Sequence, residues 1–334
     1  MQDAEHILMK NLGKLISKYR RNEGLTVSVI RTDMAVEAFE NVEGGSVEGV
    51  RVSRWETDGV EITEVLITDN EAAQLLGKPR GSYLTLECPL LLERDPDARL
   101  AVASILSEEI GRLLPEREAG APVLVVGLGN RDITPDSLGP GVVDRTLVTR
   151  HIQGAPFAAG NMDSVCAVAP GVLGVTGIES MELVEAVSRA VRPRVILCVD
   201  SLAARDSHRI GCSIQLTDTG IQPGAGVGNH RRPLTRESVG APVISLGMPT
   251  VIYAATLARD AFAWLARREG DAEDHEEALA DMEKALLGDA IGEMIVTPRD
   301  IDAIVQDAVG IIASGINRAL HPNLSDAEIS AMME

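Results

Sequence analysis

The pattern of apolar and polar residues predicts an α/β fold in the middle of the chain. Continuous apolar runs of strand length occupy residues 122–129, 164–171 and 194–201, a pattern typical of parallel strands that are covered on both faces. Apolar residues at helical spacing fill the intervals 139–152 and 177–192. This β-α-β-α-β order predicts a mostly parallel sheet sandwiched by helices.

The segments before this core predict additional strands and helices. Residues 60–68 and 83–92 are β-like, and residues 69–79 between them read as a capped short helix with a Gly/Pro stop. Residues 95–116 predict a helix that begins after Asp95 or Pro96. Helical spacing also occurs near the N-terminus, where residues 1–30 predict an amphipathic helix.

The segments after the core predict two more strands and then helices. The strands are expected at 209–218 and 241–249, with a glycine-rich loop between them. Helices are expected at 250–268, 271–287 and 298–320. We take the α/β core as residues 120–270, approximately, with N-terminal β/α additions and C-terminal helices.

Composition excludes several classes of function. The 334 residues carry a net charge of -19, and no Lys/Arg-rich run offsets it, so direct binding to nucleic acid is not expected. Two tryptophans, three tyrosines and three phenylalanines are too few to form base-stacking platforms. The four cysteines lack metal-site spacing and indicate free thiols in a reducing cytoplasm, and no apolar run is long enough to span a membrane.

The turn after the first core strand allows two interpretations. Gly127 and Gly129 match the first half of a dinucleotide-binding fingerprint, but Asp132 stands where its third glycine belongs. The alternative is a carboxylate site, because Asp136 and Asp200 both follow core strands, and the carboxyl ends of parallel strands meet in one crevice. Two carboxylates there could divide acid and base roles on an attacking water. Simple helix capping by these residues is the commoner use of such spacing and stays open.

Long blocks of the chain resemble the germination protease family of spore-forming Firmicutes. The blocks are "RTDMAVEAFE", "GLGNRDITPDSLGPGVVDRTLVTRHI", "VAPGVLGVTGIES", "VILCVDSLAAR" and "GAGVGNHRR". The resemblance implies an endopeptidase of an atypical aspartic type that degrades small acid-soluble spore proteins. It also implies a self-processing zymogen, a homotetramer, a location in the cytoplasm of the forespore or spore core, and a fold related to the hydrogenase-maturation proteases (phosphorylase/hydrolase-like).

The resemblance implies roles for particular residues. Asp136 in the "TPD" turn and Asp200 before "SLA" fall on the two catalytic aspartates of the family. Backbone N–H groups of the turn formed by Gly127, Gly129 and Asn130 are candidates to stabilise an oxyanion.

The second glycine-rich loop supplies candidates for binding the substrate. Asn229 and Arg231 lie in it and would hold a substrate whose cut site is flanked by acidic residues. A flexible surface loop with exposed arginines is the alternative interpretation.

A substrate-like sequence occurs inside the chain itself. The family's substrates are cut within a segment such as Thr-Glu-Phe-Ala-Ser-Glu, after the first acid, and "TDMAVE" reproduces that pattern. We therefore predict self-cleavage between Asp33 and Met34, with residues 1–33 as a propeptide and residues 34–334 as the protease domain. The alternative is that this segment is only a connection between a strand and a helix.

One position departs from the family, and rival functions remain. Tyr253 stands where the family leads us to expect an aspartate. No cofactor is predicted, and no metal either, since His208 and His230 lack ligand spacing to a second histidine. A metal-dependent maturation-type peptidase and a non-catalytic binding protein on the same fold are the alternatives.

Overall fold

The computed structural model describes residues 32–42, 46–117, 121–152, 162–222, 232–269 and 294–333. The chain divides into two compact units. The larger comprises residues 31–251 and 297–334, and the smaller comprises residues 1–30 and 252–296. The amphipathic helix expected at 1–30 and the acidic helix expected at 271–287 lie outside the described residues.

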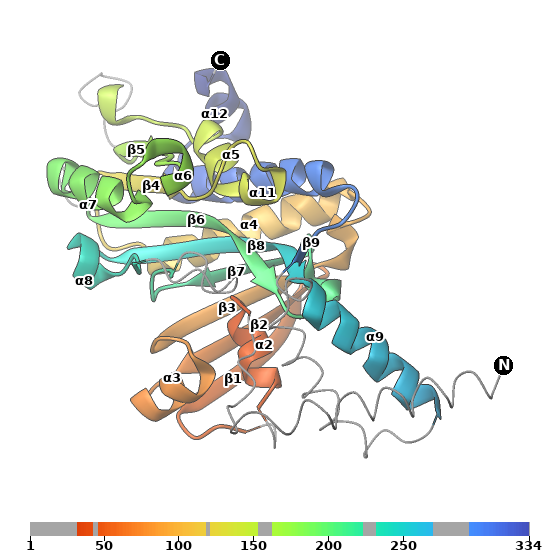
Figure 1. The fold of residues 1–334 in the computed structure, drawn as a ribbon. Helices are drawn as coiled ribbons and strands as arrows, with labels where there is room; N and C mark the ends of the chain where they lie inside the picture. Colours follow the sequence, from red (N-terminus) through yellow and green to blue (C-terminus); the bar gives the residue numbers. More distant parts are fainter. Residues whose placement is uncertain are drawn as a thin grey trace. The chain divides into compact units, whose positions relative to one another are not determined.

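The larger unit is built on a mixed sheet (Figure 1). Its strand order is β1-β2-β3-β7-β8-β6-β4-β5. The bounds are β1 Val50–Thr57, β2 Val60–Ile67, β3 Gly81–Glu87, β4 Val123–Gly127, β5 Val165–Val168, β6 Val195–Ala204, β7 Ser213–Thr217 and β8 Val243–Tyr253. The α/β class is confirmed, but the expectation of a mostly parallel sheet is wrong, because the N-terminal strands and β7 add antiparallel pairs to the parallel β4–β6 core. Parallel pairing joins β4 to β5 and β6, whereas β1, β2, β3, β7 and β8 pair antiparallel in that order.

The helices predicted at 69–79, 95–116, 177–192 and 298–320 are present close to those positions, but other described helices differ from the predictions. Their bounds are α2 Ala35–Glu40, α3 Asn70–Leu76, α4 Pro96–Leu113, α5 Leu138–Asp144, α6 Leu173–Thr176, α7 Ser180–Val191, α8 Arg236–Val239, α11 Ile301–Leu320 and α12 Asp326–Met333. Short 3₁₀ turns are η1 Pro89–Leu91, η2 Thr134–Asp136, η3 Arg150–Ile152 and η4 Ser207–Arg209. The sequence did not predict α2, α6, α8 or α12, and residues 250–253, expected to begin a helix, belong to β8. Helix α5 stops at Asp144, although helical spacing continues to residue 152.

Local sequence explains the ends of α3 and α4. The side chain of Asp69 accepts a hydrogen bond from Ala72 N at the start of α3, and Gly77 ends that helix with a φ of 62°. Asp95 caps α4 in the same way, accepting from Ala98 N, and Pro96 occupies the first helical position.

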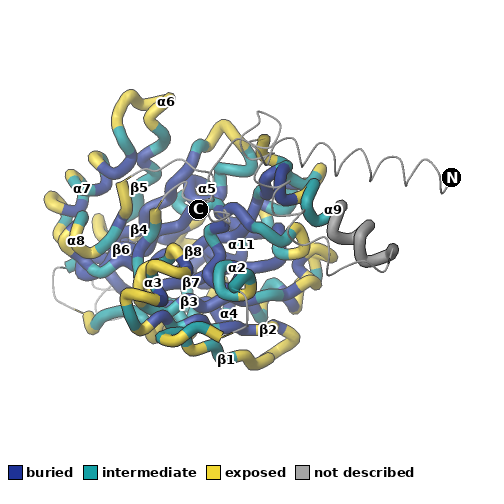
Figure 2. Tube along the Cα trace, turned by 60° about the horizontal axis from the view of Figure 1, so that its bottom comes forward, coloured by how far each residue is buried: buried dark blue, intermediate teal, exposed yellow. Residues whose placement is uncertain are grey.

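Alternating burial explains the continuous apolar runs of the core strands. In β4, Val123 and Val125 pack into a cluster with residues of α4, α5 and α11, while Leu124 and Val126 pack with residues of α7 and α8. Helices therefore cover both faces of the sheet, and its central strands are buried throughout (Figure 2). A third cluster joins α2 and α3 to β2 and β3.

The smaller unit contains the end of β8, helix α9 (Ala254–Glu269) and β9 (Ile295–Val296) among its described residues. Ile252 and Tyr253 pair antiparallel with Val296 and Ile295, and Ala254 N donates to Met294 O at 2.9 Å. No helix among the described residues is both long and apolar enough to cross a membrane.

Candidate active site

The glycine turn after β4 serves close packing of backbone on backbone. A Cβ added at Gly127 would lie 2.1 Å from Gly139 O, and one at Gly139 would lie 2.3 Å from Leu128 O. Both glycines therefore let the start of α5 approach the end of β4. The close packing of backbone on backbone therefore accounts for these glycines without a bound phosphate.

Asp136 is held over the end of β4 by this turn. Its Oδ2 accepts a hydrogen bond of 2.8 Å from Asn130 N, and a Cβ at Gly129 would meet Asp136 O at 2.0 Å. On the other side of η2, Thr250 Oγ1 donates to Pro135 O at 2.7 Å. The Asn130 N–H, a candidate oxyanion donor, is thus engaged with the carboxylate of Asp136.

Asp200 lies on the neighbouring strand and is buried, with 6% of its surface exposed. Its Oδ1 accepts from Ser201 N at 2.9 Å. Gly127 is paired with Val199 in the parallel register, and Leu128 N donates to Val199 O at 2.8 Å. Asp200 therefore follows directly on the residue that anchors the turn.

The structure brings Asp136 and Asp200 to the same edge of the sheet. η2, which carries Asp136, contacts β6, which carries Asp200. Asp136 follows β4 as expected, whereas Asp200, expected just after its strand, lies inside β6, which continues to Ala204 and bonds to Asp33 through Ala203. Neither carboxylate caps α5, for which Ser137 is the N-cap residue.

Gly129 is a sensitive position in this arrangement, because its φ of 114° combines with the contact to Asp136 O. We expect Gly129→Ala to lower the free energy of unfolding by about 3 kcal/mol, through backbone strain and displacement of η2. Gly77→Ala is the matched control, since Gly77 has a φ of 62° with nothing within 4 Å of an added Cβ. That change should cost about 1 kcal/mol. Urea denaturation of both variants measures the difference, and equal losses would contradict the packing argument.

The segment that contains the predicted cleavage point docks on the end of β6. Asp33 N donates to Ala203 O at 2.9 Å, and Asp33 Oδ2 accepts from Ala203 N at 2.8 Å. Met34 is fully buried and extended, and α2 begins at the next residue. The segment therefore does lead into a helix, while the Asp33–Met34 peptide bond itself lies before that helix.

Glu37 fixes the downstream side of this segment. Its carboxylate accepts from Arg205 N at 2.7 Å and from Asp206 N at 2.8 Å, and also from the Thr32 hydroxyl. Burial raises the pKa of the Glu37 carboxyl above its ordinary value, against the opposing effects of these hydrogen bonds and of Arg209. Arg209 in turn binds Glu40 and Glu87 at 2.8 Å.

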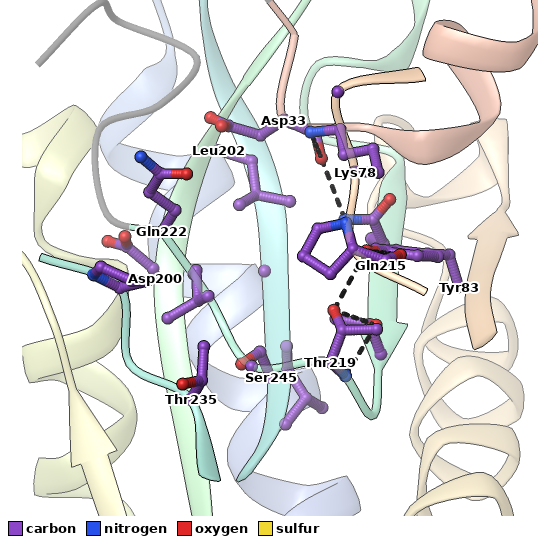
Figure 3. Close-up of a pocket in the computed structure, with 18 residues that line it drawn as sticks. Asp33, Lys78, Tyr83, Asp200, Leu202, Gln215, Thr219, Gln222, Thr235 and Ser245 are labelled. Carbon is purple, nitrogen blue, oxygen red and sulfur yellow. Dashed lines mark hydrogen bonds between the residues drawn. The ribbon is translucent and has the colours of Figure 1, made fainter. Parts of the chain in front are cut away.

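A cavity of about 100 Å³ joins the segment to the candidate catalytic strand (Figure 3). Asp33 and Asp200 both line it, as do Lys78 and Gln215. Leu202, two residues after Asp200 on β6, lies between Asp200 and Asp33 in the view. Asp136 is not among the lining residues.

Sequence reasoning did not single out Lys78 or Gln215. Lys78 follows the glycine that ends α3, and Gln215 lies in the middle of β7. Neither belongs to a recognisable motif, and 136 residues of sequence separate them. The sequence offered two weak signals of a functional role: a polar residue inside an apolar strand, and a lysine between the glycine and proline that end a helix. Both features also have ordinary structural explanations.

Other predicted site residues lie outside this cluster. Asn229 and Arg231 fall outside the described residues, as does His230. His208 is exposed in η4, where its Nδ1 lies 2.9 Å from Asp206 Oδ1. Tyr253 is buried at the end of β8 and belongs to the smaller unit. Within the described ranges, no three His, Cys, Asp or Glu side chains are grouped closely enough to hold a metal ion.

Comparison with known proteins gives one consistent result. The family model described as "Germination protease" matches residues 28–288. The germination protease of Caldanaerobacter subterraneus subsp. tengcongensis is 40% identical over 318 residues, which cover 91% of this chain and 98% of that protein. The germination protease of Clostridium tetani is 36% identical over 323 residues, covering 91% and 99%.

A solved structure with some similarity is the [NiFe] hydrogenase maturation protease HycI from Thermococcus kodakarensis KOD1. It is 17% identical and covers 53% of this chain and 99% of its own, with a TM-score of 0.29, a likeness too weak to argue from. The family match and the two curated relatives extend over most of the chain and agree with each other. The chain therefore belongs to the germination protease family and is an endopeptidase.

Proposed function

We propose that this endopeptidase starts the degradation of small acid-soluble spore proteins during germination, and that it is made as a zymogen that cuts itself between Asp33 and Met34. Asp136 and Asp200 activate the attacking water. The observation that carries the proposal is that η2, with Asp136, follows β4 and contacts the adjacent parallel strand β6, which carries Asp200, while the substrate-like segment docks on β6 at Ala203. The family resemblance adds a homotetramer in the cytoplasm of the forespore.

The two carboxylates divide the proton transfers. In the proposed mechanism one of the two carboxylates is ionised and the other holds a proton. The ionised carboxylate removes a proton from water as its oxygen attacks the peptide carbonyl carbon. The protonated one donates to the leaving amine. Asn130 N–H keeps Asp136 oriented, and Ser201 N–H does the same for Asp200.

The net charge of the chain suits such substrates. A charge of -19 attracts basic DNA-binding proteins and raises their rate of encounter. Because the attraction acts through solvent, it weakens as the salt concentration rises.

Cleavage of a defined peptide tests the proposal. The full-length chain, after self-processing, is incubated with a peptide that contains Thr-Glu-Phe-Ala-Ser-Glu, with and without a chelator, and the products are weighed by mass spectrometry. We expect a single cut after the first glutamate, unaffected by the chelator, and a much slower cut when both glutamates are replaced by glutamine. Inhibition by the chelator would favour the metal-dependent maturation-type peptidase. An uncut peptide would favour the non-catalytic binding protein.

A further inference from the structure

The carbonyl group of Asp33 is the centre of an unusual set of contacts. Lys78 Nζ donates to Asp33 O at 3.0 Å, and Gln215 Nε2 donates to the same oxygen at 3.1 Å. Figure 3 shows both side chains converging on Asp33 from β7 and from the loop after α3. This oxygen belongs to the peptide bond that the proposed function places at the self-cleavage point.

The remaining groups of the two side chains fix them in this position. Lys78 Nζ also donates to Thr32 O at 3.0 Å. Gln215 Oε1 accepts from Ala35 N at 2.7 Å, so its amide is oriented with the nitrogen toward Asp33. Lys78 and Gln215 thus bind the backbone before, at and after Asp33. These hydrogen bonds are made with backbone atoms and not with the Asp33 side chain.

Burying a lysine at position 78 is energetically unfavourable for a contact with only a structural role. Burial lowers the pKa of its ammonium group, while the charges of Asp33 and Glu37 act in the opposite direction. Removing an ammonium group from water costs free energy, which the two carbonyls and the charges of Asp33 and Glu37 offset only in part. If the carbonyl oxygen becomes an anion, its attraction to the ammonium group offsets this desolvation cost, because charge–charge attraction is strong inside a protein.

The geometry points to Lys78 and Gln215 as the oxyanion-stabilising pair for the cut between Asp33 and Met34. This inference rests on the proposed function and adds two residues to its machinery. When the water oxygen bonds to the carbonyl carbon of Asp33, the π electron pair moves onto Asp33 O, where the ammonium and amide N–H groups stabilise it. The pair returns as the C–N bond breaks, and the nitrogen of Met34 takes a proton from the acidic carboxyl group. One water is consumed, leaving a carboxylate on Asp33 and an amine on Met34.

The cavity supplies the space that this step needs. Its volume of about 100 Å³ exceeds the ~10–15 Å³ that one water requires, and it is lined by both Asp33 and Asp200. Asp33 also precedes α2, whose N-cap residue is Met34, with Met34 O accepting from Ala38 N at 3.1 Å. The carbonyl at the predicted cut is thus outside the helix and held by two donors.

The alternative role for Lys78 is that of a residue that only keeps the segment at Thr32 and Asp33 bound to the protein. The two roles predict opposite results. The full-length chain is followed by intact-mass spectrometry, and the first-order rate of cutting between Asp33 and Met34 is measured for the parent, Lys78→Met and Gln215→Glu. Removing one oxyanion donor should slow cutting at least about 100-fold. Removing a residue that only keeps the segment bound should leave the rate unchanged or increase it.

Controls separate folding from chemistry. Arg80→Met removes a cationic side chain that is exposed in the same loop, and it should leave the rate unchanged. Gln215→Glu keeps the acceptor for Ala35 N and replaces the N–H donor to Asp33 O with a carboxylate oxygen, so it decides the matter if Lys78→Met does not fold. Thermal unfolding of each variant identifies that case.

The outcomes also distinguish this inference from the proposed function. If the parent cuts itself and Asp200→Asn does not, the proposed function holds, and a normal rate in Gln215→Glu or in folded Lys78→Met overturns the oxyanion pair alone. If Asp200→Asn still cuts, the carboxylate assignment fails, while a slow Lys78→Met still supports the pair. A parent chain that never cuts at this bond overturns both.

Discussion

An Asp200→Asn chain should remain intact between Asp33 and Met34 and should leave the Thr-Glu-Phe-Ala-Ser-Glu peptide uncut, with a rate at least about 10⁴-fold below that of the parent. Asparagine keeps an oxygen that can accept from Ser201 N, so the local hydrogen bond survives while the ability to carry a proton is lost. Asp136→Asn should have an effect of similar size, because the two carboxylates act as one unit and their losses are not additive.

The matched control for these variants is Asp132→Asn. Asp132 lies in the same turn as Asp136 but is exposed. Removing the charge of Asp132 should change the cutting rate little, which would show that a carboxylate elsewhere in the turn is not sufficient for catalysis. Normal cutting by both Asp136→Asn and Asp200→Asn would place the active site elsewhere on the protein.

Arg194→Met should produce a large loss of stability, lowering the free energy of unfolding by about 3–5 kcal/mol. Arg194 NH2 lies 3.0 Å from Asp163 Oδ2, and their side chains are only 4% and 7% exposed. The same guanidinium donates to the carbonyl of Pro115, which joins the end of α4 to the start of β6. Methionine fills similar space but removes the buried one of the two guanidinium groups at Asp163, leaving Arg117 Nε at 3.0 Å from Asp163 Oδ1 on the exposed side.

Arg189→Met provides the comparison for this stability measurement. Arg189 pairs with Glu185 at 3.4 Å one helical turn away, and its side chain is 78% exposed. Its loss should cost less than about 1 kcal/mol, since exposed pairs are weakened by solvent. Guanidinium denaturation of the two variants gives both values, and an equally small loss for Arg194→Met would show that the buried pair contributes little.

The sequence was sufficient for features that depend on local pattern. The burial of β4 on both faces and the capped start of α4 at Asp95 follow from neighbouring residues alone, and both predictions were confirmed. The end of α5 was not predictable in this way. Leu147 N donates to Asn317 Oδ1 at 2.9 Å, and Thr149 N donates to Val165 O at 3.0 Å, so contacts with α11 and β5 draw the chain out of its helical path.

The direction of strand pairing and the contacts of Lys78 and Gln215 with Asp33 could not be predicted for the same reason. Nothing in the residues of β7 states that it pairs antiparallel with both β3 and β8. Asp136 and Asp200 could be proposed because each follows a recognisable strand. Lys78 and Gln215 meet Asp33 only through that pairing of distant strands, which no spacing in the sequence records.

The firm attachment of α2 would give the proposed self-cleavage a direction. Downstream of the cut, Glu37 stays bonded to Arg205 and Asp206 and close to Arg209, so the new amino terminus keeps its place. Upstream, Asp33 is held near β6 partly because it is covalently continuous with α2, which gives it a high effective concentration at the site. Once that link is broken, the carboxyl end is diluted into solvent while the amine remains behind. Rejoining would require the diluted end to return, and the reaction is therefore one-way in practice.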